Sequence, residues 1–339
     1  MGEDFGTAGF GDFDRVHGNH HPPPSMTQVR LARPDLFHPR IVLAGCPALP
    51  EGDGDDDGLV DALRTRGLHA RWLAWDDPAV LDADLVILRA TWDYIDRLDE
   101  FKVWTRQVRN LLNSPDVVAW NTDKRYLVEL AQRGVPTVPT RHFGSGDRVV
   151  VPDGEVVVKP AVGGGSVGAQ RFTDPVPAAA HAAHLQAQGR AVLVQPYDAR
   201  VEYGETALVF LGGAQSHAFT KAAILPPEGP PVFDESGTYA LETLAPAEPD
   251  FELWELGHAA LGAAAAALGM EAAEFLYARV DVIGDRAHAR VLEVELVEPS
   301  LGWRQLDATT RTDRERDFAL AVEVALERLG LGPLSHRRP

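Results

Sequence analysis

The sequence predicts an α/β protein that opens on a small parallel sheet with helices on its faces. The main observation is that short apolar runs alternate with helical patterns from residue 41 onward, as in strands joined by crossover helices. Two later stretches add to it: a β-type run that ends in a lysine and a glycine loop at 155–169, and an acidic hairpin at 277–303. With 339 residues, 45% of them hydrophobic, the chain can bury a sizeable core and form two or three domains.

The charge balance limits the classes of partner. The chain has 32 basic and 50 acidic residues, a net charge of −18, which argues against nucleic acid or an anionic membrane as the main partner. A single cysteine, Cys46, excludes an internal disulfide framework. The sequence has no apolar run of about twenty residues and no signal-peptide pattern at its start. These features favour a reducing cytoplasm.

The first part of the chain differs from the rest in composition. Residues 1–38 are rich in Gly, Asp, His and Pro without sustained periodicity, and we expect a disordered tail. The folded body then begins with the strand I-V-L-A at Ile41, an acidic loop, and a helix at 59–66 that ends at Gly67. Short strands at 70–74 and 84–88 continue the parallel sheet.

Polar and aromatic residues follow the third strand in the segment R-A-T-W-D-Y. Ligands bind parallel sheets beyond the carboxyl ends of their strands, so Arg89, Thr91, Asp93 and Tyr94 are candidates for substrate contact. In the alternative interpretation, Trp92 and Tyr94 cap the core and Arg89 pairs with Asp93. Both interpretations are open.

A lysine near a helix start indicates an anion site. A helix at about 98–112 is followed by one that is capped by Asn121 or Thr122 and ends at Gly134. Lys124 falls in the first turn of the second helix, where its charge opposes the helix dipole, so we expect an anion between them. A solvated surface lysine is the alternative.

The glycine loop lies in the segment E-V-V-V-K-P-A-V-G-G-G-S-V-G-A, residues 155–169. Val156 to Val158 predict a buried strand that places Lys159 at its edge. Glycines allow positive φ and let backbone N–H groups approach phosphates, so the loop is a candidate nucleotide cover. It is neither a Walker A loop nor a G-x-G-x-x-G motif, and a plain glycine-rich hairpin is the alternative. The loop residues are Gly163, Gly164, Gly165, Ser166 and Gly168.

Regular elements continue after the loop. A proline at 196 marks a crossover at the end of the strand that reaches Gln195 and Tyr197. The further predicted elements are a helix at 178–188, strands at 192–197, 206–211 and 214–221, a long proline-rich loop at 226–250 and a helix at 251–268.

Acidic and apolar residues alternate on a hairpin at 277–303. Period-two alternation places Arg279 and Asp281 on one face, and Glu293 and Glu295 on one face of the returning strand. Three carboxylates could therefore converge, and Mg²⁺ takes carboxylate and phosphate oxygens. An acidic face in open water is the alternative.

Taken together, these elements resemble the ATP-grasp superfamily of carboxylate–amine ligases. The resemblance covers about residues 110–325 and rests on Lys124, Lys159 with its glycine loop, the strand end at 195–205 and the carboxylate hairpin. It is nearest to the glutathione-synthetase-like branch. The segments R-A-T-W-D-Y, W-N-T-D-K-R-Y-L and E-V-E-L-V-E-P-S-L are similar to the subgroup that includes the O-ureido-serine cyclo-ligase of cycloserine biosynthesis.

The resemblance implies an ATP-grasp fold, in which two α+β subdomains clasp ATP after a small Rossmann-like parallel domain. The implied parts are a tail at 1–38, an N-terminal domain at 39–115, a subdomain with the glycine loop at 116–195 and a C-terminal subdomain with the metal site at 196–330.

It also implies the nucleotide contacts. Lys124 and Lys159 would bind phosphates under the closed glycine loop, while Gln195 and the backbone near Tyr197 would face adenine. The ribose would bind a glutamate. Glu205 matches that position best, with Glu202 as its rival.

For the reacting end, the resemblance implies Lys221 on the γ-phosphate and Arg279 on the substrate or the transferred phosphate. Mg²⁺, as two ions and with Mn²⁺ as an alternative, would bind Asp281, Glu293 and Glu295. Many relatives have Asn in place of Glu295, so the sequence departs from the family pattern at this ligand. Ser300 is a further candidate for substrate contact.

The implied reaction transfers the γ-phosphoryl group of ATP to a carboxylate, and an amine then attacks the acyl phosphate. Such chemistry needs positioning and charge neutralisation but no nucleophilic side chain, so we assign no catalytic Ser, Cys or His. The substrates would be small amino-acid-like molecules, and a homodimer is compatible with the resemblance. We favour two separate substrates; an O-ureido-serine-type cyclo-ligase and a non-catalytic ATP-binding module are the alternatives.

Overall fold

The computed structural model describes residues 38–227, 229–233 and 240–332. The predicted tail at 1–38 therefore lies outside the described residues except for His38. Over the described ranges, no helix combines the length and the apolar character that a membrane crossing requires.

The N-terminal sheet is parallel, as predicted, with the strand order β2-β1-β3-β4. Its central strands read as continuous apolar runs, and both are buried because helices and loops cover both sheet faces. The elements of this part are β1 (Arg40–Gly45), α1 (Leu59–Thr65), β2 (His69–Ala74), β3 (Leu85–Ala90), α2 (Leu98–Gln107) and β4 (Leu111–Leu112).

The predicted helix at 98–112 is too long. Helix α2 ends at Gln107 because Val108 turns to an extended conformation, with φ −65° and ψ 131°. Leu111 and Leu112 then pair with β3 as the short edge strand β4. Ser114 then caps the next helix, α3 (Pro115–Asn121).

Lys124 does not lie in the first turn of a helix. Helix α4 (Tyr126–Gln132) begins two residues after it, so the opposition between Lys124 and a helix dipole does not apply. Instead, the Lys124 backbone N–H donates to the Ala161 carbonyl at 2.8 Å, which connects this segment to the residue that directly follows the strand at 156–160.

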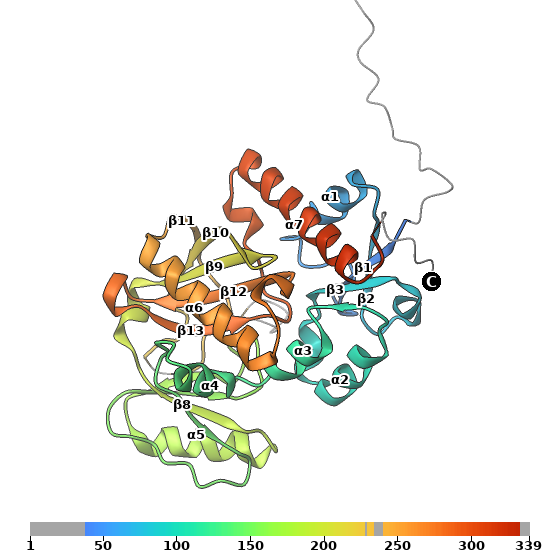
Figure 1. Ribbon diagram of the computed structural model, residues 1–339. Helices are drawn as coiled ribbons and strands as arrows, with labels where there is room; N and C mark the ends of the chain where they lie inside the picture. The colour runs from blue at the N-terminus through green and yellow to red at the C-terminus, as the bar shows by residue number, and fades with distance from the viewer. Residues whose placement is uncertain (1–37, 228, 234–239, 333–339) are drawn as a thin grey trace, which may run out of the picture. The chain divides into compact units, whose positions relative to one another are not determined.

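The second sheet is antiparallel, with the order β5-β8-β6-β7, and helix α5 (Pro175–Ala187) covers one face (Figure 1). Val156 and Val158 face α5 and are fully buried, which confirms the predicted strand before Lys159. The strands are β5 (Arg141–Phe143), β6 (Val156–Pro160), β7 (Gln170–Phe172) and β8 (Val192–Pro196).

The third sheet is also antiparallel, with the order β11-β10-β9-β12-β13. Helix α6 (Phe251–Leu268) lies against it at Gly257, where an added Cβ would lie 2.8 Å from Leu208 Cδ1. The strands are β9 (Glu205–Leu211), β10 (Ala214–Lys221), β11 (Leu244–Ala247), β12 (Tyr277–Ile283) and β13 (Arg290–Glu295).

The long loop predicted at 226–250 is interrupted by β11, which pairs with the second half of β10. Pro246 is compatible with this short strand because β11 is an edge strand of the sheet, where a missing N–H is tolerated. Residues 228 and 234–239 of this loop lie outside the described ranges.

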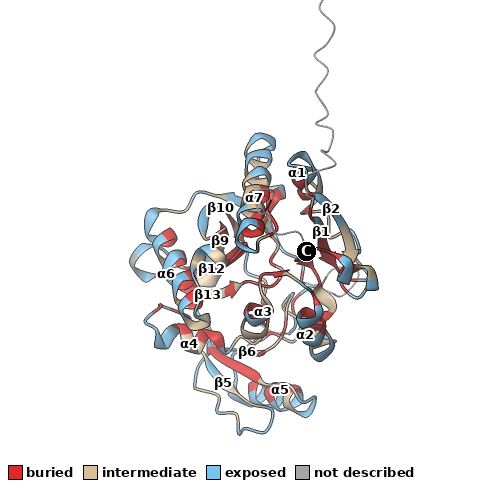
Figure 2. Cartoon of the chain, turned by 45° about the vertical axis from the view of Figure 1, so that its right-hand side comes forward, coloured by how far each residue is buried: buried red, intermediate tan, exposed pale blue. Residues whose placement is uncertain are grey.

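Helix α7 (Ala308–Arg328) connects the N-terminal parallel sheet with the third sheet. It packs on α1 and on β9, and its apolar face shares one core cluster with residues of β1, β3, β9 and β12. Figure 2 shows this buried core under helices whose outer faces are exposed. Each of the three sheets lies largely within one of the three folded ranges that the resemblance implies. The exact domain boundaries stay a prediction.

Candidate active site

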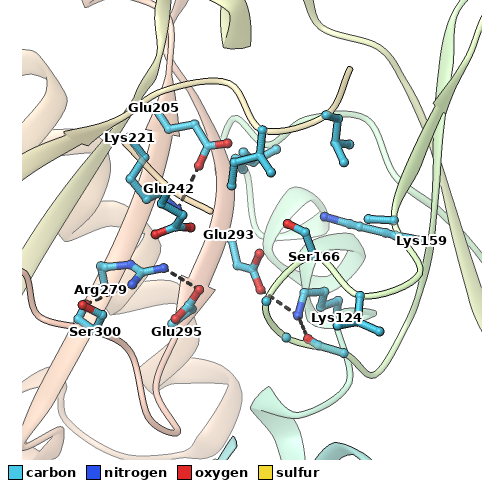
Figure 3. Close-up of a pocket in the computed structure, with 18 of the residues that line it drawn as sticks. Lys124, Lys159, Ser166, Glu205, Lys221, Glu242, Arg279, Glu293, Glu295 and Ser300 are labelled. Carbon is cyan, nitrogen blue, oxygen red and sulfur yellow. Dashed lines mark hydrogen bonds and ion pairs between the residues drawn. The ribbon is translucent and has the colours of Figure 1, made fainter. Parts of the chain in front are cut away.

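One cavity of about 470 Å³ is lined by residues from all three sheets and their loops. Figure 3 shows lysines and carboxylates pointing into it from different elements. Most of the sequence-predicted site residues line it: Tyr94, Lys124, Lys159, Gly163, Gly164, Gly165, Ser166, Gln195, Tyr197, Glu205, Lys221, Arg279, Glu293, Glu295 and Ser300.

One end of the cavity has apolar walls that suit an aromatic base. Gln195 is 3% exposed, and its amide donates to Thr140 Oγ1 at 2.8 Å. The Tyr197 ring is covered by the Arg171 guanidinium at 3.5 Å, which fixes the edge of this end. Apolar side chains complete the wall: Val138, Val157, Ile283 and Leu292.

The two rival ribose ligands are separated by the structure. Glu205 lines the cavity, whereas Glu202 is exposed on the 3₁₀ helix at 199–203 and does not line it. Glu202 instead accepts hydrogen bonds from Arg171 and from the Tyr197 hydroxyl. Glu205 is therefore the better placed of the two, and its role stays a prediction.

The glycine loop adopts the conformation that its sequence allows. Gly165 and Gly168 have φ values of 55° and 79°, and Ser166 shares this left-handed conformation with φ 61°. At Gly164 an added Cβ would lie 3.1 Å from Ile95 Cδ1, so the loop passes close to the first part of the chain. This backbone can approach a phosphate closely.

The Lys124 side chain contacts the glycine loop at Gly163. Its ammonium donates to the Gly163 carbonyl at 2.5 Å and forms an ion pair with Glu293 at 2.7 Å. Burial alone would lower the pKa of Lys124, but Glu293 raises it above the ordinary value. The lysine is therefore charged beside the loop.

Lys159 enters the cavity from β6, with its ammonium near Ser166 (Figure 3). None of the ion pairs between described residues includes it. Burial lowers the pKa of Lys159, an effect that Lys124 strengthens and that Glu293 opposes. A buried ammonium in this state is stabilised by an incoming anion.

Lys221 is held between two carboxylates on neighbouring strands. Its ammonium lies 3.0 Å from Glu205 Oε2 and 2.6 Å from Asp281 Oδ2. Burial would lower the pKa of Lys221, but Asp281 and Glu205 together raise it well above its usual range.

Arg279 connects this group to the end of the hairpin. Its guanidinium pairs with Asp281 at 2.9 Å and with Glu295 at 2.6 Å, and it donates to the Ser300 carbonyl at 2.9 Å. Although burial favours a neutral Asp281, Arg279 and Lys221 hold the pKa of that carboxyl below its ordinary value.

The three carboxylates predicted to bind metal are not gathered into one cluster. No group of three or more His, Cys, Asp or Glu side chains within the described ranges is arranged to hold a metal ion. Asp281 is 1% exposed and does not line the cavity, because Lys221 and Arg279 occupy its oxygens. Glu293 and Glu295 do line it.

These two carboxylates nevertheless fit a divalent cation in their chemistry. They offer hard oxygen donors, and burial, with the nearby charge of Glu293, raises the pKa of Glu295 to about 7 despite its pairing with Arg279. Burial is the main cause of this rise, and a divalent ion beside Glu295 would favour its charged form. The metal assignment stays a prediction.

Three of the four residues predicted at the end of β3 do not line the cavity: Arg89, Thr91 and Asp93. The Arg89 side chain is fully buried. It forms an ion pair with Asp56 at 2.9 Å and donates a hydrogen bond to the Pro299 carbonyl at 2.7 Å. The predicted pair of Arg89 with Asp93 is also wrong, since Asp93 accepts from Trp75 Nε1 at 2.7 Å.

Tyr94 combines both interpretations of that segment. Its ring stacks on Phe101 in the core of the first part, with centroids 5.0 Å apart. It also lines the cavity, next to Trp92 and Ile95. The short 3₁₀ helix at Trp92–Ile95 turns the chain so that one face packs and the other meets the cavity.

The role of the acidic loop at 51–57 was not predicted from the sequence. Asp55 accepts hydrogen bonds from Ser300 Oγ at 3.1 Å and from the Gly302 N–H at 2.8 Å. Asp56 accepts from Trp303 Nε1 at 2.8 Å. The loop therefore fixes the segment that carries Ser300, and its run of acids was the only local signal.

Two buried asparagines that anchor the hairpin were also missed. Asn113 donates to the Leu296 carbonyl at 2.7 Å, and the Leu296 N–H donates to Asn121 Oδ1 at 2.7 Å. Glu242 and Glu298 line the cavity as well and were not predicted. For Glu298, its place in the E-V-E-L-V-E segment was a signal that could have been used.

Comparison with known proteins adds the following similarities. Residues 41–113 match the family described as the N-terminal domain of D-cycloserine synthetase DcsG. The chain is 35% identical over 271 residues to the cycloserine biosynthesis protein DcsG of Streptomyces lavendulae, a match that covers 74% of this chain and 88% of that protein.

Solved structures give a consistent result. The crystal structure of D-cycloserine synthetase DcsG aligns with a TM-score of 0.74 and 31% identity, over 85% of this chain and 99% of the other. The D-alanine–D-alanine ligase of Bacillus anthracis complexed with ATP aligns with a TM-score of 0.56 over 86% of this chain and 98% of that one. Its 13% identity supports a shared fold alone.

Proposed function

The chain belongs to the DcsG family of ATP-grasp ligases, and from this premise we propose how its own residues divide the reaction among them. The protein is an ATP-dependent ligase that joins a carboxylate to an amine through an acyl phosphate and releases ADP and phosphate. One observation carries the residue assignments. Three lysines and an arginine converge on a single cavity under a glycine loop, among buried carboxylates: Lys124, Lys159, Lys221 and Arg279.

In the proposed complex, adenine occupies the apolar end near Gln195 and Tyr197, and Glu205 binds the ribose. The phosphates lie along Lys124 and Lys159 beneath the glycine loop. The support is electrostatic, because Lys159 is buried with a lowered pKa and lacks a carboxylate partner within the described part of the chain. A phosphate group would supply that partner.

Mg²⁺ binding is typical of this fold, and we assign it here to Glu293 and Glu295. Asp281, predicted as a third ligand, lies outside the cavity lining and is assigned to orienting Lys221 and Arg279. When bound, such an ion neutralises charge on the phosphoryl group that is transferred. Two ions, and Mn²⁺ in place of Mg²⁺, belong to the proposal as well. Their number is measurable by titration against the ATP-loaded enzyme.

Lys221 and Arg279 are assigned to the γ-phosphate and the reacting carboxylate. Both side chains line the cavity from strands of the same sheet, β10 and β12, and are already oriented by Asp281, so little reorganisation is needed when negative charge arrives. The acyl phosphate must also be protected from water. The Ala240 N–H donates to the Gly165 carbonyl at 2.9 Å, so the two loops over the cavity already touch.

The proposed substrates are small amino-acid-like molecules. Joining a carboxylate to the amine of a second molecule is one route. Ring closure within a single substrate is a second candidate, favoured by the similarity to a protein named for cycloserine biosynthesis. The single cysteine supports a cytoplasmic location, and a homodimer is a further part of the proposal that sedimentation velocity would test.

The test uses the full chain with ATP, Mg²⁺ and hydroxylamine. Hydroxylamine intercepts an acyl phosphate and yields a hydroxamate plus phosphate, so each true carboxylate substrate should give ADP and the hydroxamate in equal amounts. O-ureido-serine is tested alone, and a panel of amino acids is tested alone and with added amines. Products are identified by mass spectrometry.

The outcomes separate the candidates. ADP release with O-ureido-serine alone supports ring closure, while release that requires a second amine supports two-substrate ligation. Tight ATP binding without hydroxamate from any compound would contradict ligase activity and favour a non-catalytic module.

A further inference from the structure

Glu298 is a cavity residue without a role in the scheme above. It follows β13 by three residues and lines the cavity together with Trp92 and Tyr94 of the first part. The Tyr94 hydroxyl and the Glu298 carboxyl are neighbours, and each affects the pKa of the other. Because Tyr94 is itself fixed in the aromatic core, the Glu298 side chain has a defined position at this wall.

The charge of Glu298 is unbalanced. Four carboxylates around the cavity each have an ion-pair partner: Glu205, Asp281, Glu293 and Glu295. No basic side chain of the described residues lies within ion-pair distance of Glu298. Burial, reinforced by the nearby charge of Glu295, raises the pKa of Glu298 to about 8. A cation placed beside it would restore the carboxylate form.

The surroundings of Glu298 suit an organic ammonium group better than a metal ion. One neighbour is the Tyr94 phenol, and Trp92 lines the same cavity. Ammonium groups bind carboxylates and aromatic faces together, whereas Mg²⁺ binds oxygen atoms and water. Leu296 and Val297, both buried, separate Glu298 from the candidate metal ligands along the chain.

We propose that Glu298, positioned by Tyr94, binds the ammonium group of the amino-acid substrate and makes the enzyme selective for amino acids over simple carboxylic acids. The inference rests on the proposed function, since it assigns a substrate group to the same cavity. It adds a specificity residue that neither the nucleotide nor the metal assignment uses.

Two other carboxylates without an ion pair line the cavity, Asp53 and Glu242. Glu242 acts on Lys221 and Arg279, whose pKa values it raises, so its charge is directed at two cations of the protein. Asp53 is the remaining rival. Its Oδ1 already accepts the Asp55 N–H at 3.0 Å within the acidic loop. The basic residue Arg304 shares its part of the cavity, since an added Cβ at Gly54 would lie 2.2 Å from Arg304 Nη2. Asp53 is therefore the less suitable partner for a second cation.

The experiment pairs a residue change with the matching change in the ligand. Binding of O-ureido-serine and of 3-(ureidooxy)propanoic acid, which lacks only the amino group, is measured by calorimetry with Mg²⁺ and a non-hydrolysable ATP analogue. Wild-type enzyme should bind O-ureido-serine about 10- to 100-fold more tightly, as expected for a charge-assisted contact. Glu298→Gln should remove most of this preference by weakening only O-ureido-serine.

The controls separate recognition from structure and from metal binding. Tyr94→Phe should reduce the preference partly, and Glu255→Gln on the exposed face of α6 should leave it unchanged. The Mg²⁺ dependence of nucleotide binding should stay within about twofold of wild type in Glu298→Gln, because the proposal assigns no metal to it.

Several results would overturn the inference. An unchanged preference in Glu298→Gln, a preference lost in Asp53→Asn instead, or a shifted Mg²⁺ requirement in Glu298→Gln would each contradict it while leaving the proposed function intact. Wild-type enzyme that binds neither compound and forms no hydroxamate would contradict the proposed function itself, and the inference with it.

Discussion

At the scale of residues, Lys159 and Glu298 are two buried cavity side chains whose charges find no ion-pair partner within the described ranges. Burial shifts each toward its neutral form, lowering the pKa of Lys159 and raising that of Glu298 to about 8. Their neighbours, by contrast, form a closed network in which Lys221 and Arg279 share Asp281. The unbalanced pair therefore marks where ligand charge is expected.

Replacing Lys159 by Ala should weaken ATP binding about 10- to 100-fold, the loss expected for one charge-assisted hydrogen bond of about 1.5–3 kcal/mol. Calorimetry with a non-hydrolysable ATP analogue measures it. Lys102→Ala, on α2 and outside the cavity lining, is the matched control and should bind as wild type. Equal affinities in both variants would remove Lys159 from the nucleotide site.

The ligand-free enzyme should lose thermal stability as the pH rises. The pKa of Glu298 is about 8 in the folded protein against 4.5 for an ordinary glutamate, so the folded state binds the extra proton between these values. Its contribution to stability is complete below pH 4.5 and is lost as the pH rises through 8.

Melting temperatures between pH 5 and 9 check this expectation. Glu298→Gln, which carries no titrating group, should show a smaller decline than wild type over the same range. Parallel curves for the two proteins would show that Glu298 titrates normally.

At the scale of elements, the β12–β13 hairpin combines two kinds of carboxylate. Asp281 is enclosed by Lys221 and Arg279, whereas Glu293 pairs with Lys124 at the cavity wall. The first therefore supports the fold as well as the site, and the second lies where ligands arrive. Sequence alternation alone did not distinguish them.

Glu293→Gln and Asp281→Asn should both abolish Mg²⁺-dependent turnover, but with different effects on stability. Asp281→Asn removes the shared partner of two buried cations and should cost about 3–5 kcal/mol of unfolding free energy. Glu293→Gln should cost clearly less, because its side chain is 20% exposed. Urea unfolding and turnover assays measure the two effects; normal activity in both variants would mean that the acidic face is only solvated.

The acidic loop should control substrate binding through the segment at 300–304. Asp55→Ala removes an acceptor for Ser300 and for the Gly302 N–H, so the KM for the carboxylate substrate should rise severalfold while ATP affinity stays unchanged. Asp57→Ala, an exposed residue of the same loop, is the control. A rise in KM for ATP alone would show that the loop serves the nucleotide instead.

At the scale of the whole molecule, the cavity is assembled from parts that are far apart in the sequence. Asp55 and Ser300 are 245 positions apart and Asn113 and Leu296 are 183 apart, yet both pairs are hydrogen-bonded. Helix α7 secures the arrangement by packing on both α1 and β9. Loop residues of the N-terminal domain and residues of the two later sheets therefore line one cavity.

Nucleotide binding should slow hydrogen exchange in the glycine loop and in the segment after residue 240, which meet through the Ala240 to Gly165 hydrogen bond. The N-terminal strands β1 and β3, already buried, should exchange at unchanged rates. Exchange measured by mass spectrometry with and without Mg²⁺ and the ATP analogue tests this. Uniform protection across all sheets would argue against a local closure of the loops.

The sequence by itself determined the α/β class, the central strands, the glycine loop and the membership of the ATP-grasp ligases, since these depend on local periodicity and on motifs with fixed spacing. It also identified the lysines and the hairpin carboxylates that line the cavity; their individual roles stay predictions.

The edge strands β4 and β11 were missed because each is short and becomes a strand only by pairing with a neighbour. The partners of Arg89, the enclosure of Asp281 and the position of Glu298 beside Tyr94 were decided by the tertiary structure alone. Each depends on which distant segments pack together, and a side chain's charge, burial and partners are properties of that packing rather than of its neighbours in the chain.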